Sequence, residues 1–422
     1  VFLATCIASA IAMFAMAFLA NKPFCLGPGM GINSFFAVVV ADLITMAGMD
    51  YVTSFQTVMC IVFIEGVLFI VLSLFNIREK IVEAIPLGVR LGIAPAIGMM
   101  LMNIGFGSNI YIADENYNQF YVMRDFFGAL TAGRAKELMG SAYPVMILSV
   151  ITLFVGFFTI VILAHKGVKA AVIIGMFVAS IVYWIGQYFA LGTNPFASLE
   201  SATFVPAFSD MAATTLFKLN FAGLANLGVF TVITLVITFC LIDMFDTIGT
   251  LVGTASRAGM LDKDGNMPNM KEALLSDAIG TVTGSLTGTS TITTFIESAS
   301  GVEAGGRTGL TALTTGVLFV ACIFLAPVAA IIPAAATSSA LVYVGVLMVK
   351  ALKSINFDDI SVAVPVILML LAMPVSSSIG HAIGLGMISY TIIKLLLGKG
   401  KEVSVLTYVI SVLFLIKFFL VV

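Results

Sequence analysis

The sequence contains little charge, and that shortage excludes most classes of protein. Only 10% of its 422 residues are charged and 60% are hydrophobic, with a mean hydropathy of +1.13. Soluble chains are about 25% charged, so this chain cannot solvate the surface of a globule of its size. Its 20 Lys and Arg residues do not exceed its 22 Asp and Glu residues, so we expect no partner among nucleic acids.

Cysteine, histidine and enzyme motifs are also scarce. The five cysteines show no CxxC spacing and lie in or beside apolar segments, where a thiol acts as a small buried hydrophobe. Two histidines are too few for a histidine-rich metal site. The patterns HExxH, GxSxG and GxxxxGK[ST] do not occur. We therefore expect no metal, no bound cofactor and no enzymatic activity, but a multi-pass protein of the cell membrane in contact with the lipid bilayer.

Apolar runs recur along the whole chain. A spanning helix needs roughly 20 apolar residues. The apolar stretches are 1–20, 34–47, 54–75, 85–106, 143–164, 168–190, 226–254, 308–333, 336–352, 359–374, 376–397 and 402–421. A weaker Gly-, Ser- and Thr-rich pair near 272–286 and 290–305 predicts two broken spans, which makes about fourteen spans in all.

Lys and Arg indicate the orientation, because cytoplasmic ends of spans are enriched in both. If Val1 starts on the outer side, 15 of the 20 Lys and Arg residues, Arg78 among them, fall at inward ends. The polar stretches 107–142 and 191–222 are then predicted to face outward.

Two interruptions of the apolar pattern resemble each other. Residues 22–34 are rich in Gly and Pro, and residues 287–298 are rich in Gly, Ser and Thr. A shift of 264 residues places Asn33 on Glu297. Irregular backbone at membrane depth must contact protein or line a cavity, and paired interruptions are typical of inverted-repeat transporters that bind substrate where the broken helices meet. The alternative is a pair of kinks filled by neighbouring side chains.

Acidic residues inside the spans are the main candidates for function, because each costs about 3 kcal/mol at the bilayer centre. Asp243 and Asp246 are three residues apart and share one helix face, and Thr250 follows one turn later. Two buried acids repel each other, so one is expected to hold a proton. Such a group could carry a proton across the membrane or accept N–H donors from a polar ring. A structural hydrogen-bond network remains the alternative.

Glu297 follows the second interruption, where a short helix is expected to begin. It is predicted to accept a hydrogen bond from substrate opposite Asp246, or else to be a carboxylate stabilised by the helix dipole. Asn33, its predicted repeat partner, offers both a donor and an acceptor. For Glu65, bundle packing and a proton path are equally open, and Asp277 is expected near a membrane interface.

Three motifs, in this order, resemble those of one family. Residues 27–36, GPGMGINSFF, are similar to the APGMGLNAFF-type motif of the AzgA-like guanine/hypoxanthine/adenine permeases, a branch of the nucleobase–cation/ascorbate transporter family. Residues 243–251, DMFDTIGTL, resemble that branch's second motif, and residues 288–309 resemble its third. The similarity covers essentially the whole chain, although Gly27 and Ser34 replace the usual alanines.

The resemblance implies an all-α polytopic membrane protein: a seven-plus-seven inverted-repeat transporter with core and gate domains and two broken helices that carry short extended segments. It implies import of purine nucleobases with protons, driven by the proton gradient. Thr250 argues for the purine branch, because the xanthine/uracil branches carry a different residue there. The expected substrate-binding residues are Asp246, Glu297, Asn33, Gly31, Thr250 and Thr294. The expected proton-coupling residues are Asp243, Asp246 and Glu297.

The resemblance also suggests a division of the chain into four parts. Residues 1–75 and 223–333 are predicted to form the core, and residues 76–222 and 334–422 the gate, with the outward loops in the first gate segment. The family's first helix precedes Val1 and is expected to be missing. Related folds allow a homodimer through the gate domain.

The expected mechanism places a planar purine between the interruptions, contacted by backbone N–H groups from about 27–33 and 289–297, while core and gate rock to alternate access. The alternatives within the fold are uracil, xanthine or a small anion as substrate. From other classes, a non-transporting receptor stays open. An intramembrane enzyme would need a nucleophile–base pair or metal cluster that the sequence does not display.

Overall fold

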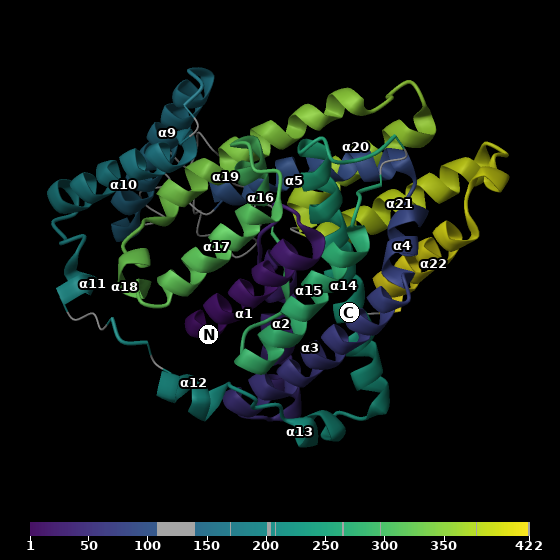
Figure 1. Ribbon diagram of the computed structural model, residues 1–422, viewed down its shortest axis with the longest axis horizontal. Helices are drawn as coiled ribbons and strands as arrows, with labels where there is room; N and C mark the ends of the chain where they lie inside the picture. Colours follow the sequence, from purple (N-terminus) through teal and green to yellow (C-terminus); the bar gives the residue numbers. More distant parts are fainter. Residues whose placement is uncertain are drawn as a thin grey trace.

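The computed structural model describes residues 1–107, 140–168, 170–200, 204–206, 208–263, 266–295, 297–376 and 378–420. Within these ranges the chain is a helical bundle with two short strands (Figure 1). The first half contains α1 (Phe2–Ala15), β1 (Leu26–Pro28), α2 (Met30–Ala47), α3 (Tyr51–Leu74), α4 (Ile77–Ala84), α5 (Leu87–Gly107), α9 (Tyr143–His165) and α10 (Ala171–Ala190). A π-helical turn, Met16–Ala20, extends α1.

The second half mirrors this order of long helices, a strand and more helices. It contains α14 (Val229–Arg257), α15 (Met270–Thr287), β2 (Ile292–Thr294), α16 (Ser298–Glu303), α17 (Gly309–Cys322), α19 (Ala334–Val349), α20 (Ile360–Ser376), α21 (Ile379–Leu396) and α22 (Val405–Leu420). Short connecting helices are α11 (Ala197–Glu200), α12 (Phe208–Thr214), α13 (Phe221–Asn226) and α18 (Ala326–Ala329).

Eight helices in the described part of the chain are long and apolar enough to cross a membrane, and four shorter apolar helices accompany them. Each of the twelve predicted apolar stretches overlaps one of these helices. The predicted outward stretch 107–142 lies almost wholly outside the described residues.

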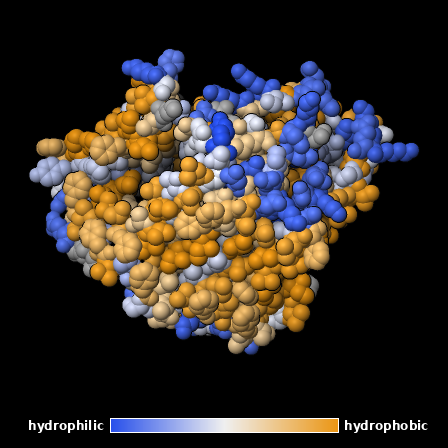
Figure 2. Space-filling model, in the orientation of Figure 1, coloured by the Kyte–Doolittle hydropathy of each residue, from blue (hydrophilic) through white to orange (hydrophobic). Residues whose placement is uncertain are grey.

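The surface matches a lipid environment. Figure 2 shows hydrophobic residues over most of the visible face, with hydrophilic residues gathered along the end near the α4 and α20 labels of Figure 1. Large apolar side chains such as Phe158, Ile173 and Phe177 are exposed on the helices, which water would not favour over so wide an area. The chain is therefore a multi-pass membrane protein.

The two strands come from the two predicted interruptions and pair with each other. β1 and β2 are antiparallel, with Leu26 opposite Thr294 and Pro28 opposite Ile292. The pairing extends beyond the strands, because the Gly29 N–H donates to the Thr291 carbonyl at 3.3 Å and the Phe295 N–H donates to the Cys25 carbonyl at 3.1 Å. Backbone that cannot be helical at this depth is thus satisfied by its repeat partner.

Two details of the predicted repeat are wrong. The helix after the first strand begins at Met30 and the helix after the second begins at Ser298, a shift of 268 rather than 264 residues, so Glu297 corresponds to Gly29 and not to Asn33. The stretch near 272–286 is not broken either, because α15 is one continuous helix. Its Gly280 serves close packing instead: a Cβ there would lie 2.9 Å from Ala12 and Ile292.

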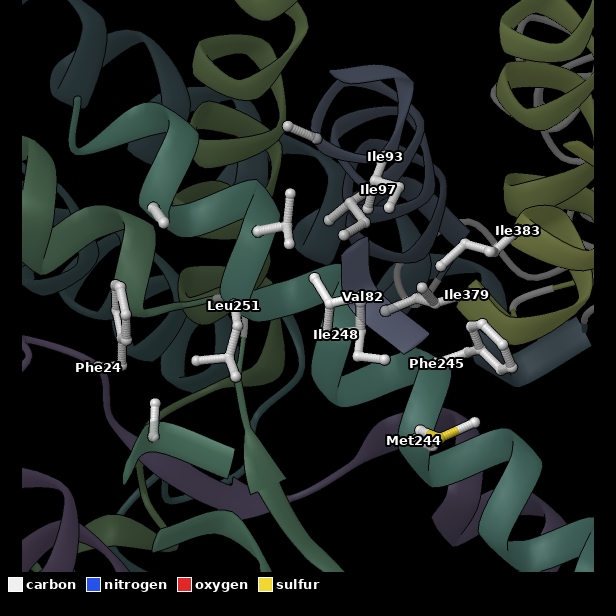
Figure 3. Close-up of a cluster of buried hydrophobic side chains, with 14 of the residues drawn as sticks. Phe24, Val82, Ile93, Ile97, Met244, Phe245, Ile248, Leu251, Ile379 and Ile383 are labelled. Atoms are coloured by element: carbon white, nitrogen blue, oxygen red, sulfur yellow. The ribbon is translucent and has the colours of Figure 1, made fainter. Parts of the chain in front are cut away.

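Helix α14 organises the centre of the bundle. Its apolar face, with Met244, Phe245 and Ile248, packs against Ile93 of α5 and Ile379 of α21 (Figure 3). Its other face carries polar and acidic side chains that are equally buried, namely Asp243, Asp246, Thr247, Thr250 and Thr254. One helix therefore seals the hydrophobic core and presents the polar groups of the site.

The described helices pack in two groups. α1, α3, α15 and α17 surround the strand pair, whereas α9, α10, α19 and α20 pack with one another and with α5. α14 and α21 contact each other and α5. This pattern is compatible with the predicted core and gate, whose boundaries stay a prediction.

The closest approach of α5 and α19 depends on a pair of glycines. A Cβ on Gly98 would lie 2.6 Å from the carbonyl oxygen of Gly345, whereas a Cβ on Gly253 would lie 3.5 Å from the nearest atom, the Cα of Ala94. Gly98→Ala should therefore destabilise the fold by about 1–3 kcal/mol, the usual cost of overpacking. Thermal unfolding in detergent, with Gly253→Ala as the tolerated control, measures this. Equal melting temperatures for both variants would contradict the packing.

Candidate functional site

A cavity of about 370 Å³ opens beside the strand pair. Its volume is in the ~300–1,000 Å³ range of small-molecule sites. It is lined by both strands and by side chains from helices of both repeats, namely Thr5, Gly27, Pro28, Gly29, Met100, Asp246, Thr250, Thr293, Thr294, Phe295, Glu297, Phe319 and Ile379. A mixed lining of apolar and convergent polar groups is typical of a ligand site.

Asp246 supplies a buried carboxylate to this cavity from the middle of α14. Its side chain is 4% exposed, and its Oδ1 accepts a hydrogen bond at 3.2 Å from the N–H of Gly380, in the first turn of α21. The helix N-terminus favours negative charge. Thr250, one turn further along α14, donates its hydroxyl to the Asp246 carbonyl oxygen at 2.8 Å, so its methyl group rather than its hydroxyl hydrogen is free to face the cavity.

Glu297 supplies a second carboxyl from the residue that precedes α16. It is half-buried, and its side chain makes no capping hydrogen bond to α16. The structural alternative, a carboxylate used to cap this helix, is therefore not supported by a hydrogen bond. The side chain lines the cavity together with Asp246.

The strand pair forms a tight wall that depends on two glycines. A Cβ on Gly27 would lie 2.9 Å from the ring of Phe295, and a Cβ on Gly29 would lie 2.7 Å from Thr293. The Thr294 hydroxyl lines the cavity and is buried without a hydrogen-bond partner in the described part of the chain. Buried polar atoms are normally satisfied, so this oxygen is a candidate contact for a ligand.

The structure brings together four of the six predicted substrate-binding residues. Asp246, Glu297, Thr250 and Thr294 line the cavity. Asn33 lines a neighbouring cavity of about 320 Å³, where its Oδ1 accepts from the Ser290 hydroxyl. Gly31 lies in the first turn of α2 and is not among the residues lining either cavity.

The backbone does not offer all the donors that were predicted. The N–H groups of Gly29 and Phe295 are used between the two interrupted segments, and the N–H of Thr294 donates to Asp277 Oδ1 at 3.2 Å. These three groups are unavailable to a ligand in this conformation. Side chains must therefore carry more of the recognition than the sequence predicts.

A buried ion pair lies behind the strands, and its positions were assigned wrongly from the sequence. Arg78 of α4 and Asp277 of α15 are both fully buried, with 3.1 Å between the guanidinium and the carboxylate. Arg78 also donates to the Leu274 carbonyl at 2.9 Å and lies 4.1 Å over the ring of Phe69. The Lys and Arg count placed Arg78 at an inward end and Asp277 near an interface. Sequence hydropathy cannot reveal such a pairing over 199 residues.

Asp243, predicted for proton coupling, is absent from the cavity lining. It is fully buried on the polar face of α14, where Thr247 is shared between it and Asp277, at 3.5 Å and 3.1 Å from their carboxylate oxygens. Among the described residues, no group of three or more His, Cys, Asp and Glu side chains is arranged to hold a metal ion.

Known proteins match this chain along its length. A family model described as a permease family matches residues 1–382. The adenine permease AdeP of Escherichia coli is 34% identical over 418 residues, covering 99% of this chain and 84% of that protein. The guanine/hypoxanthine permease PbuO of Bacillus subtilis is 36% identical over 429 residues, covering 100% of this chain and 89% of that protein.

Solved structures agree on the fold. The transmembrane domain of a cyanobacterial bicarbonate transporter, BicA, aligns with a TM-score of 0.53 at 16% identity, over 89% of this chain and 88% of that one. This likeness confirms the predicted seven-plus-seven inverted-repeat fold.

Arg78→Leu should destabilise the protein by about 3–5 kcal/mol, because it leaves the Asp277 carboxylate buried without its cation. Arg78→Leu/Asp277→Leu, which removes both charges, should recover part of that loss. The exposed pair Lys394–Glu402, at 2.7 Å, is the control, since its loss in Glu402→Gln should cost about 0–1 kcal/mol. Thermal unfolding in detergent compares the variants, and similar losses for Arg78→Leu and Glu402→Gln would contradict the ion pair's role.

Proposed function

The chain belongs to the permease family, and from this premise we propose that it is a secondary active transporter that imports purine nucleobases by proton symport. The proposed substrates are guanine, hypoxanthine and adenine. The names of the adenine and guanine/hypoxanthine permeases that it resembles support this substrate class. A membrane transporter of this family is not an enzyme.

The observation that carries the proposal is the cavity itself. Purines are planar and carry N–H donors on the ring and on exocyclic groups, so Asp246 and Glu297 are suited to accept hydrogen bonds from them. The Thr294 hydroxyl can pair with a ring nitrogen or carbonyl, and the Phe295 ring offers an aromatic face or edge. A buried polar site rejects bases that lack the matching groups, since its own groups would be left unpaired.

Transport then follows from alternating access. The predicted core, 1–75 and 223–333, would carry the cavity, while the predicted gate, 76–222 and 334–422, would rock against it. Asp246, which binds the first turn of α21, would be the point where substrate binding is felt by the gate. Protonation of Asp243, Asp246 or Glu297 would couple entry to the proton gradient, and a homodimer through the gate is part of the same proposal.

The second candidate is a small anion, uracil or xanthine on the same fold. The two carboxyl groups that line the cavity oppose a small anion, because like charges repel in a site of low dielectric. Neither carboxyl distinguishes purine from uracil by charge alone, so substrate competition must decide between the bases.

Asp246→Asn and Glu297→Gln should each reduce hypoxanthine uptake about ten- to hundredfold, because a hydrogen bond to a charged group contributes about 1.5–3 kcal/mol. Uptake of labelled hypoxanthine by cells that lack their own purine permeases measures this. Asp42→Asn, which changes an exposed acid on α2, is the matched control and should keep full uptake. Full uptake by Asp246→Asn or Glu297→Gln would remove that residue from the site.

Competition among unlabelled bases tests the substrate class. Guanine, hypoxanthine and adenine should inhibit labelled hypoxanthine uptake, whereas xanthine and uracil should compete poorly because they leave acceptors of the cavity unpaired. Strong inhibition by uracil and none by guanine would favour the second candidate.

A further inference from the structure

Three acids and one cation share a fully buried pocket of polar groups behind the strands. Glu65 of α3, Asp243 of α14 and Asp277 of α15 have no solvent exposure, and neither has Arg78. The guanidinium contacts the Asp277 carboxylate directly. Glu65 and Asp243 therefore share the interior with an ion pair that is already balanced.

Glu65 and Asp243 are also short of hydrogen-bond donors. Glu65 Oε2 accepts from the Thr291 hydroxyl at 3.3 Å, and Asp243 Oδ1 lies 3.5 Å from the Thr247 hydroxyl. Glu65 Oε1 and Asp243 Oδ2 have no partner within the described ranges. A buried carboxylate normally needs several donors or a cation, so two ionised acids here would be unfavourable. The pair is built to retain a proton.

Both acids are connected to the cavity through hydroxyl groups on β2 and its approach. Thr291, which contacts Glu65, accepts the Gly29 N–H with its carbonyl oxygen at 3.3 Å. Thr247, which lies next to Asp243, pairs with the Thr293 hydroxyl at 2.6 Å, and Thr293 lines the cavity. A change of charge at the pair is therefore felt at the strands that would hold the substrate.

Every charged or titratable group that acts on the pair belongs to this cluster. Glu65 is influenced by Arg78 and Asp277, and Asp243 by Glu65, Asp277, Arg78 and Asp246. The thiol of Cys240, one turn before Asp243 on α14, also interacts with both acids. Arg78 keeps Asp277 as its partner, which leaves Glu65 and Asp243 as the groups with room for a proton.

We propose that Glu65 and Asp243 together hold the transported proton, in a site separate from the purine cavity and joined to it by Thr291 and by the Thr247–Thr293 hydroxyl pair. This inference rests on the proposed proton symport and assigns its proton site. Asp246 and Glu297 are then left to bind the base. A proton that enters the pair removes a buried charge behind the strands, and its release on the inner side restores that charge.

The test uses the purified protein in liposomes with a weakly buffered lumen. Addition of hypoxanthine outside should raise the external pH as protons enter with the base. Glu65→Gln imitates the protonated acid, so it should abolish this hypoxanthine-dependent proton uptake, and Asp243→Asn should do the same. Glu83→Gln, which changes an exposed acid on α4, is the matched control and should take up protons as the starting protein does.

Hypoxanthine-dependent thermal stabilisation shows whether each variant still folds and binds. Stabilised Glu65→Gln without proton uptake supports the proton pair. Glu65→Gln with the starting rate of proton uptake overturns the pair and leaves the proposed function intact. An unfolded Glu65→Gln also overturns it, since a neutral amide must be tolerated where a neutral acid resides. If the starting protein moves hypoxanthine without protons, or with sodium, the pair and the symport both fail; if it neither moves nor binds any purine, the proposed function fails instead.

Discussion

The pairing of two unwound segments is the constraint on which the rest of this structure depends. A chain that leaves the helical conformation inside a bilayer exposes N–H and C=O groups that lipid cannot satisfy. Here β1 and β2 satisfy each other, with additional hydrogen bonds at Gly29 and Phe295. Because each strand comes from a different repeat, the pair ties the two halves of the chain together. The cavity then forms beside a wall that is rigid and already satisfied.

Helix α14 divides the polar chemistry into two places. Asp246 and Thr250 face the cavity, while Asp243 and Thr247 face the buried cluster with Asp277 behind the strands. The apolar side chains between them, such as Phe245 and Ile248, seal the core. A single helix can therefore serve a ligand on one side and a proton on the other, with the strand β2 between the two sites. This separation lets substrate binding and proton binding influence each other through hydroxyl contacts rather than compete for the same carboxylate.

The sequence predicted much of this because membrane constraints are written in composition and spacing. Apolar runs located the helices, Gly and Pro in 22–34 located the first interruption, and the acids of α14 were singled out because charge inside a span is costly. What it could not predict depends on three-dimensional contact. The repeat register was set by two strands of three residues each, too short to leave a periodic signal. Small residues in α15 serve close packing, which looks in sequence like a break.

The buried ion pair was missed for a related reason. Arg78 stands next to a turn and close to Lys80, so charge counting treated it as an inward-facing cation, yet its guanidinium reaches across to α15. Glu65 was left open between packing and proton transfer because nothing in α3 alone reveals Thr291 or Asp243 beside it. The substrate cavity has a similar limit: Asp246, Glu297 and Thr294 could be named from motifs, but Phe295, Met100 and Ile379 are cavity residues only through the fold.

The central claim is that the cavity beside the strand pair holds the purine between Asp246 and Glu297. An experimentally determined structure of the protein with hypoxanthine bound tests it most directly. The account predicts the base inside the 370 Å³ cavity, with hydrogen bonds to both carboxyl groups and its ring near Phe295. A base found instead beside Asn33 in the neighbouring cavity, without contact to Asp246 or Glu297, would contradict the account.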